Sequence, residues 1–162
     1  MNSKTVLSAE EIWHHITNEA KAGAAAEPNF ADYFAKTILD YEDLGAALSN
    51  HLAKKLASAA ATAPMLKEII QGIFADKAII AKVSRDIQAT VARDSACDLY
   101  SSPFLYFKGF LSLQAYRAAH ELWLQGRTSL ALLLQHRISI SFAVDIHPAA
   151  IIGSGVMIDH AT

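Results

Sequence analysis

The stretch Asp145-Ile-His-Pro-Ala-Ala-Ile-Ile-Gly-Ser-Gly-Val-Met-Ile-Asp-His-Ala161 decides the fold of the carboxyl-terminal part of the chain. Within it, isoleucines recur every six residues, at Ile146, Ile152 and Ile158. A helix repeats a face about every 3.6 residues and a strand about every 2, so neither explains this spacing. A hexapeptide repeat is typical of a left-handed parallel β-helix, in which each turn sends one aliphatic side chain into a triangular core. We therefore expect such a β-helix to begin here.

Acidic and basic side chains are interleaved with these isoleucines. Asp145 precedes the first, and Asp159 and His160 follow the third. Histidine has an unperturbed pKa near ~6.5, so it can accept and return a proton at neutral pH. One coil of a β-helix takes three six-residue turns, about 18 residues. Asp145 and His160 are fifteen residues apart, a spacing that permits contact on successive coils without requiring it.

The chain holds barely one such coil, whereas a solenoid needs about three stacked repeats to be stable. We therefore expect a longer protein of which this is the front part, or a partner chain that caps the exposed end. The predicted division is a helical assembly domain over residues 1–137 and the start of the β-helix over residues 138–162.

The composition of the chain limits the classes of function it can have. The chain has 162 residues, 52% of them hydrophobic, and a formal net charge of −2, which does not favour a nucleic-acid-binding protein. Cys97 is the single cysteine, so no intramolecular disulfide can form, as is typical of a reducing compartment. No apolar run approaches the ~18 to 20 residues of a membrane span. We expect a cytoplasmic protein that binds neither nucleic acid nor membrane.

The rest of the chain reads as helices. Ser8 and Glu11 form a capping box before a helix over residues 9–26. Leu44, Leu48, Leu52 and Leu56 form the buried stripe of a helix over residues 42–60. Further helices are expected over residues 29–40, from Pro64, from Asp76, over residues 104–125 and over residues 127–136. The helices over 42–60 and 104–125 should be central.

Two segments interrupt this pattern. Residues 94–103 are polar and end at a proline, which predicts a loop. Ile138-Ser-Ile-Ser-Phe142 alternates strictly, which predicts a strand. The expected fold class is mainly α: a multi-helix domain followed by the first coil of a left-handed parallel β-helix.

Several motifs together resemble those of bacterial serine acetyltransferases, from about Ser8 to the last residue. They are DIQA (86–89), ARD (92–94), SSPFLYFKGF (101–110), LQAYR (113–117) and VDIHPAAIIGSGVMIDHAT (144–162). Hexapeptide periodicity alone indicates only a broad class of acyltransferases. The helical front half and the KGF and QAYR motifs narrow the resemblance to the serine enzymes.

The resemblance implies a reaction and roles for four residues. Such enzymes transfer acetyl from acetyl-CoA to the serine hydroxyl and make O-acetylserine for cysteine synthesis. It implies that His160 is the general base on that hydroxyl and that Asp145 orients and polarises its imidazole. It implies that Asp94 and Asp159 hold serine, chiefly by its ammonium group.

The resemblance also implies partners. Acetyl-CoA lies between adjacent β-helices of a trimer, helical domains join two trimers into a hexamer, and L-cysteine inhibits from the serine site. A C-terminal tail enters O-acetylserine sulfhydrylase. This tail and the acetyl-CoA contacts would lie beyond residue 162. We therefore expect this chain alone to bind no cofactor and to be inactive or nearly so.

Each residue has a plainer interpretation as well. His160 can be a frayed terminal residue, Asp145 a turn former, Asp159 a solvated side chain, and Asp94 a helix cap. Asp98 competes for the role of Asp94, and His147 is expected to be structural. No metal site is expected. Two other functions stay open: a non-enzymatic oligomerisation module, and a hexapeptide acyltransferase with another acceptor.

Overall fold

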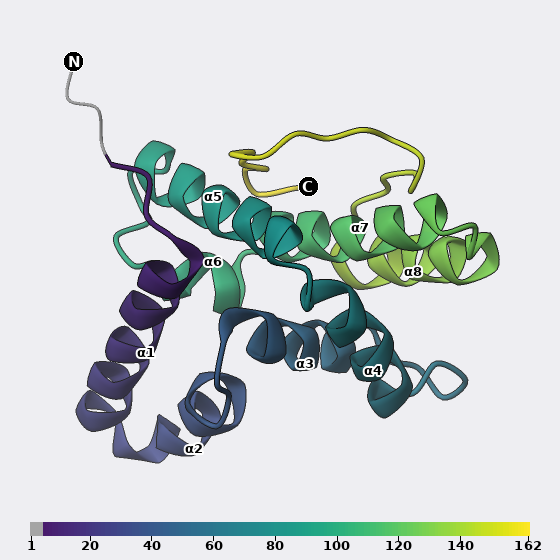
Figure 1. Cartoon of the computed structure of the whole chain (residues 1–162). Coiled ribbons are helices and arrows are strands. Elements are labelled where there is room, and N and C mark those ends of the chain that lie inside the picture. The colour runs from purple at the N-terminus through teal and green to yellow at the C-terminus, as the bar shows by residue number, and fades with distance from the viewer. Residues whose placement is uncertain (1–4) are drawn as a thin grey trace.

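Helices make up most of the computed structural model, which describes residues 5–162 (Figure 1). In chain order they are α1 (Ala9–Ala26), a 3-10 turn η1 (Pro28–Phe30), α2 (Ala31–Phe34), a π-helical turn η2 (Ala35–Leu39), α3 (Leu44–Leu56), α4 (Ala63–Phe74), α5 (Lys77–Arg93), α6 (Ser101–Tyr106), α7 (Lys108–Leu124) and α8 (Thr128–Phe142). No strand occurs within residues 5–162. The mainly α fold class is thus confirmed.

Side chains next to the helix starts satisfy their free N–H groups. The predicted capping box is confirmed: Ser8 Oγ accepts from Glu11 N at 3.1 Å, and Glu11 Oε2 accepts from Ser8 N at 2.6 Å. Asp43 caps α3 by accepting from Ala46 N at 2.8 Å. These local signals explain why the sequence places most helices within a few residues.

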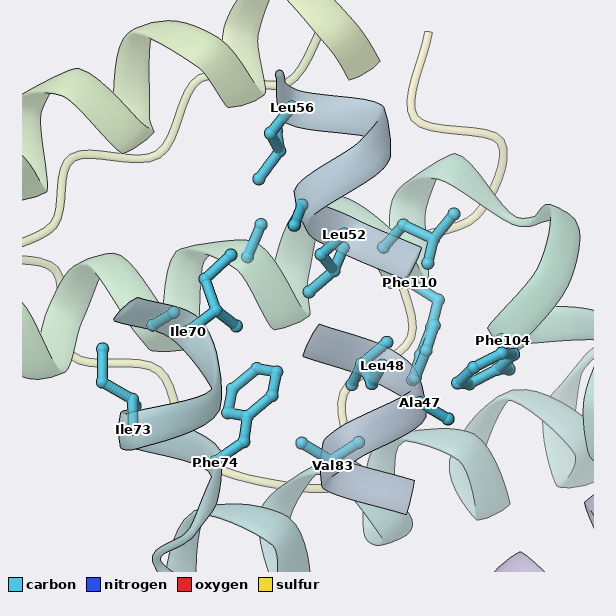
Figure 2. Close-up of a cluster of buried hydrophobic side chains, with 14 of the residues drawn as sticks. Ala47, Leu48, Leu52, Leu56, Ile70, Ile73, Phe74, Val83, Phe104 and Phe110 are labelled. Carbon is cyan, nitrogen blue, oxygen red and sulfur yellow. The ribbon is translucent and has the colours of Figure 1, made fainter. Parts of the chain in front are cut away.

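The apolar core lies where α3 and α4 pack together, with α7 lying against α4, α5 and α8. Figure 2 shows the predicted stripe of Leu48, Leu52 and Leu56 facing Ile70 and Phe74 of α4. Leu48, Leu52 and Leu56 are fully buried. Most residues of α3 and α7 are buried, which confirms that these two helices are central.

The predicted loop over residues 94–103 is too long at its end. Helix α6 begins at Ser101, because the carboxylate of Glu19 accepts from Tyr100 N at 3.1 Å and Ser101 N at 2.7 Å. The predicted continuous helix over 104–125 is also divided, since Phe107 has an extended backbone with ψ of 107°. The chain therefore turns between α6 and α7.

The strand predicted over residues 138–142 is wrong, because α8 continues to Phe142. Ile138 and Phe142 also stand four residues apart, so both face the core, at 2% and 5% exposed, while Ile140 is 59% exposed. Arg137 Nε and Nη2 donate to the carbonyls of Leu56 and Ala57 at 2.7 and 2.9 Å. Helix α8 therefore provides hydrogen-bond donors for backbone carbonyl groups at the C-terminal end of α3, which lack partners within that helix.

The terminal segment, residues 143–162, follows α8 without helix or strand. Ala143 adopts the left-handed conformation, with φ of 56°, and ends α8. Figure 1 draws the segment in yellow, running back over α7. Ile146, Ile152 and Ile158 are each half-buried. The predicted β-helix coil is not seen in this segment and stays a prediction.

Candidate functional site

The terminal segment carries three of the four predicted site residues, and side chains of α7 hold its backbone. His120 Nδ1 lies 2.7 Å from the carbonyl oxygen of Pro148, and the Tyr116 hydroxyl donates to the carbonyl of Ala150. At the other end of α7, Lys108 contacts Thr162. The segment therefore runs antiparallel to α7, from its last turns to its first residue.

A close approach follows at Gly109. A Cβ atom at this position would overlap the carbonyl oxygen of Ile158. Only glycine leaves room for the backbone here, immediately before Asp159 and His160. This explains the glycine of the KGF motif, to which sequence reasoning assigned no role.

A buried ion pair lies beneath the middle of the segment. Arg117, 4% exposed, donates through Nη2 to Asp86 Oδ2 at 2.7 Å, and Asp86 is fully buried. Gln114 Nε2 donates to the same oxygen at 3.0 Å. Asp86 lies on α5, while Gln114 and Arg117 lie on α7, so these residues also join the two helices.

His160, the predicted base, lies near the end of the segment with its side chain 87% exposed. Its Nε2 is 3.6 Å from Asp159 Oδ1. Its backbone is left-handed, with φ of 51°, which is uncommon for a residue other than glycine. The imidazole is thus free to meet a ligand from solvent.

Asp145, predicted to orient His160, is bound elsewhere. Its Oδ1 accepts from Gln135 Nε2 of α8 at 2.8 Å. Among residues 5–162, no hydrogen bond or ion pair joins Asp145 to His160. The structure therefore pairs His160 with Asp159 and leaves Asp145 at the beginning of the segment.

Asp94 ends α5 and is half-buried. Its Oδ1 accepts from Ala96 N at 2.8 Å, a bond that closes the turn following α5. Its neighbour Arg93 donates from Nη1 to the carbonyl of Gly155 at 2.8 Å. Asp94 thus lies next to a residue that binds the terminal segment. Burial, and secondly the charge of Asp94, raise the pKa of the nearby Cys97 thiol.

Sequence reasoning missed the residues that bind the segment. Asp86 and Arg117 lie within the DIQA and LQAYR motifs, but no role was derived for them. The available signal was a charged residue on each of two largely buried helix faces. Charged residues are almost never fully buried unless they are paired. His147, expected to be structural, accepts from Ala149 N at 3.1 Å and packs edge-on against Trp123.

Two clefts lie apart from the predicted site residues. The larger, about 670 Å³, lies between the starts of α1, α3 and α5. The smaller, about 540 Å³, lies between α5 and the terminal segment and includes Arg85, Gln88 and Ser154. In the part of the chain that the structure describes, no three His, Cys, Asp or Glu side chains cluster as metal ligands would. None of the helices described is long and apolar enough to cross a membrane.

Comparison with known proteins identifies the family. The model of the serine acetyltransferase N-terminal domain matches residues 12–115. The chain belongs to the serine acetyltransferase family. The serine acetyltransferase of Salmonella typhimurium is 51% identical over 154 residues, which are 94% of this chain and 56% of that protein. The chain thus spans little more than half the length of this relative.

Solved structures agree with this assignment. A serine acetyltransferase in complex with CoA matches with a TM-score of 0.93 at 50% identity, over 95% of this chain and 66% of that one. A complex with cysteine matches with a TM-score of 0.92 at 50% identity, over 96% and 65%. The Neisseria gonorrhoeae enzyme in complex with serine matches with a TM-score of 0.90 at 49% identity, over 93% and 62%.

Proposed function

We propose that the protein containing this chain transfers the acetyl group of acetyl-CoA to the hydroxyl of L-serine, and so makes O-acetylserine for cysteine biosynthesis. The observation that carries the proposal is family membership, from a domain match over residues 12–115 and 51% identity to a serine acetyltransferase. Related enzymes in complex with CoA and with serine support the two substrates. A related enzyme bound to cysteine supports L-cysteine as a ligand, and we propose that it inhibits by occupying the serine site.

In the proposed mechanism, His160 acts as general base. It removes the proton of the serine hydroxyl as the oxygen attacks the thioester carbonyl. The carbon–sulfur bond then breaks, and the imidazolium returns the proton to the leaving CoA thiolate. An acid bonded to the other ring nitrogen would fix the tautomer and stabilise the imidazolium. Asp145 is proposed for this role, which requires it to exchange Gln135 for His160.

Substrate binding is proposed to use two further carboxylates. An α-ammonium group favours carboxylates nearby, and Asp94 and Asp159 are proposed to hold it. Asp159 stands beside His160, which would put the bound serine next to its base. Asp94 comes from the end of α5, so the serine site would be shared between the helices and the terminal segment.

Further proposals concern the domain division, the β-helix, the assembly and the partners of the whole protein. The domain division at residues 137 and 138 and the β-helix both stay proposals, in which half-buried Ile146, Ile152 and Ile158 would complete their burial against further coils. From the same family assignment we propose that the whole protein forms trimers, that two trimers join into a hexamer, and that it is cytoplasmic. We also propose that it has a tail that binds O-acetylserine sulfhydrylase. The acetyl-CoA contacts are assigned to residues beyond those of this chain.

The proposal is tested by measuring release of the CoA thiol from acetyl-CoA with serine as acceptor. The whole protein should acetylate serine, and free cysteine should compete with serine. His160→Ala should lower kcat by about 10² to 10⁴-fold, the usual contribution of a general base. His147→Ala, in the same segment, is the matched control and should retain kcat within about three-fold, since its side chain contacts only a nearby turn and Trp123.

The outcomes separate the alternatives. A whole protein that acetylates a sugar but not serine would contradict the serine assignment. The absence of any transfer, with self-association on native mass measurement, would favour an oligomerisation module instead. Near-native turnover by the 162-residue chain alone would contradict its predicted inactivity.

A further inference from the structure

The ion pair of Asp86 and Arg117 is costly to bury. Arg117 Nε and Nη2 both donate to Asp86 Oδ2, at 2.9 and 2.7 Å, and the two side chains are 4% and 0% exposed. Removing two charges from water consumes most of the free energy gained from their attraction. Replacing such pairs by apolar residues is often neutral or stabilising. Stability of the helices alone therefore does not explain this pair.

The second carboxylate oxygen of Asp86 and the remaining N–H groups of Arg117 bind the backbone of the terminal segment. Asp86 Oδ1 accepts from Val156 N at 3.0 Å. Arg117 Nη2 donates to the carbonyl of Gly153 at 2.7 Å, and Nη1 to that of Ile152 at 3.4 Å. One acid and one base thus bind both donors and acceptors of an irregular backbone, which has no sheet or helix of its own to satisfy them.

These contacts hold residues 152–156, which come just before Asp159 and His160 in the chain. One of the binding side chains, Asp86, is on α5, the helix that Asp94 ends. Asp86 and Asp94 are both carried by α5 or its end, and Arg93 adds a bond to Gly155 at 2.8 Å. The two halves of the proposed serine site are therefore connected through this cluster. A displacement of about 1 Å at a reacting group can cost about 10²-fold in rate.

We propose that Asp86 and Arg117 are positioning residues for acetyl transfer: they hold the backbone of residues 152–156 against α5 and α7 and so fix where Asp159 and His160 lie relative to Asp94. This inference rests on the proposed function. It assigns the pair to the geometry of the site and not to the stability of the helical domain.

The decisive variant replaces both charges by apolar residues, Asp86→Leu with Arg117→Met. It leaves no unpaired buried charge, so the helices should fold. Their thermal midpoint should fall only by what the loss of an acceptor for the buried Gln114 amide costs. In the whole enzyme, kcat should fall at least about ten-fold, while KM for acetyl-CoA stays unchanged. In the 162-residue chain, amide exchange at Val156 should accelerate at least about ten-fold, because its acceptor is gone.

The matched control removes an exposed pair of the same charges. Lys36 and Asp32 form an ion pair at 2.6 Å with side chains 65% and 75% exposed. Asp32→Asn with Lys36→Gln should change neither kcat nor exchange at Val156. Arg117→Lys serves as the conservative variant, since lysine keeps the charge but lacks the fork that binds Asp86 and Gly153 together. It should retain more kcat than the apolar double variant.

Two results would overturn the positioning role. One is unchanged exchange at Val156 in the apolar double variant. The other is a kcat that falls only in proportion to a loss of folded protein. The exchange measurement needs no activity, so it decides this inference even if the whole protein proves not to acetylate serine. Absence of serine acetylation by the unaltered whole protein would instead contradict the proposed function.

Discussion

The helical core and the terminal segment are held by different forces. Around α3 and α4, apolar side chains such as Leu48, Leu52 and Ile70 are fully buried, so burial of apolar surface stabilises them. Residues 143–162 are bound mostly through their backbone, by polar side chains of α5 and α7. Burial is non-directional, whereas hydrogen bonds have fixed geometry. The contrast suggests that the core supplies stability and the segment's contacts supply position.

The largest effect is expected from a cavity in the core. Leu52→Ala removes a fully buried side chain between α3 and α4 (Figure 2). It should lower the free energy of unfolding by about 2–5 kcal/mol, measured by urea titration. Amide exchange at Val156 should stay the same if the segment opens locally, without global unfolding.

Leu124→Ala is the control for that variant. Leu124 is 64% exposed at the end of α7, so the same change should cost no more than about 0.5 kcal/mol. If the exchange rate at Val156 rises in Leu52→Ala in proportion to the loss of unfolding free energy, the contrast between core and terminal segment is contradicted. It would mean that core and segment open as one unit.

The second effect is a pH dependence that belongs to the core. His51 is buried, stacks on Phe104 and lies 3.3 Å from the carbonyl of Leu105. Burial, and secondly the charge of Lys55, lower the pKa of His51 from 6.5 to about 4. The folded state therefore resists a proton that the unfolded chain accepts. Stability from this group is complete above pH 6.5 and falls as pH drops towards 4.

Between pH 7 and pH 5, His51 should lower the free energy of unfolding by about 2 kcal/mol. His51→Gln keeps a donor for Leu105 but does not titrate, so its unfolding free energy should lack this part of the pH dependence. The difference between the two proteins, measured by urea titration at both pH values, isolates His51 from the other histidines. An equal pH dependence in both would contradict the lowered pKa.

The same contrast explains what the sequence could predict. Helices with local stripes and caps, such as α1 with its Ser8 cap and α3 with its leucine stripe, were predicted within a few residues, because their signals are local. The strand over 138–142 was wrong because five alternating residues also contain an i, i+4 pair, and the packing of α8 on α3 selects the helix. Short apolar runs are ambiguous in this way.

For the site, the sequence indicated which residues but not their arrangement. The resemblance supplied His160, Asp145, Asp94 and Asp159, and their roles stay predictions. The pairing of Asp86 with Arg117 could not be derived, because the two are 31 residues apart and meet only when α5 packs on α7. Residues that bind a backbone leave no periodic pattern in the sequence. A charge on a buried helix face can indicate such a residue, but only the fold reveals what it binds.

The smallest expected effect on stability sharpens the comparison most. Gly109→Ala places a methyl group against the carbonyl oxygen of Ile158, a backbone atom that no change of rotamer can move away. Phe110 and Leu111, buried at 3% and 1% exposed, anchor the start of α7, so the terminal segment should shift instead. Alanine meanwhile favours the helix by up to about 1 kcal/mol. The free energy of unfolding should therefore change by less than about 1 kcal/mol.

Gly72→Ala is the matched control, because a Cβ atom at Gly72 of α4 meets nothing within 4 Å. It should stabilise by about 0.5–1 kcal/mol without affecting the segment. Gly109→Ala alone should shift the amide resonances of Ile158, Asp159 and His160 and accelerate their exchange. If those resonances stay in place, the close approach to α7 does not hold the segment there. If they move while urea stability is preserved, position and stability are separable in this chain, as the two kinds of contact require.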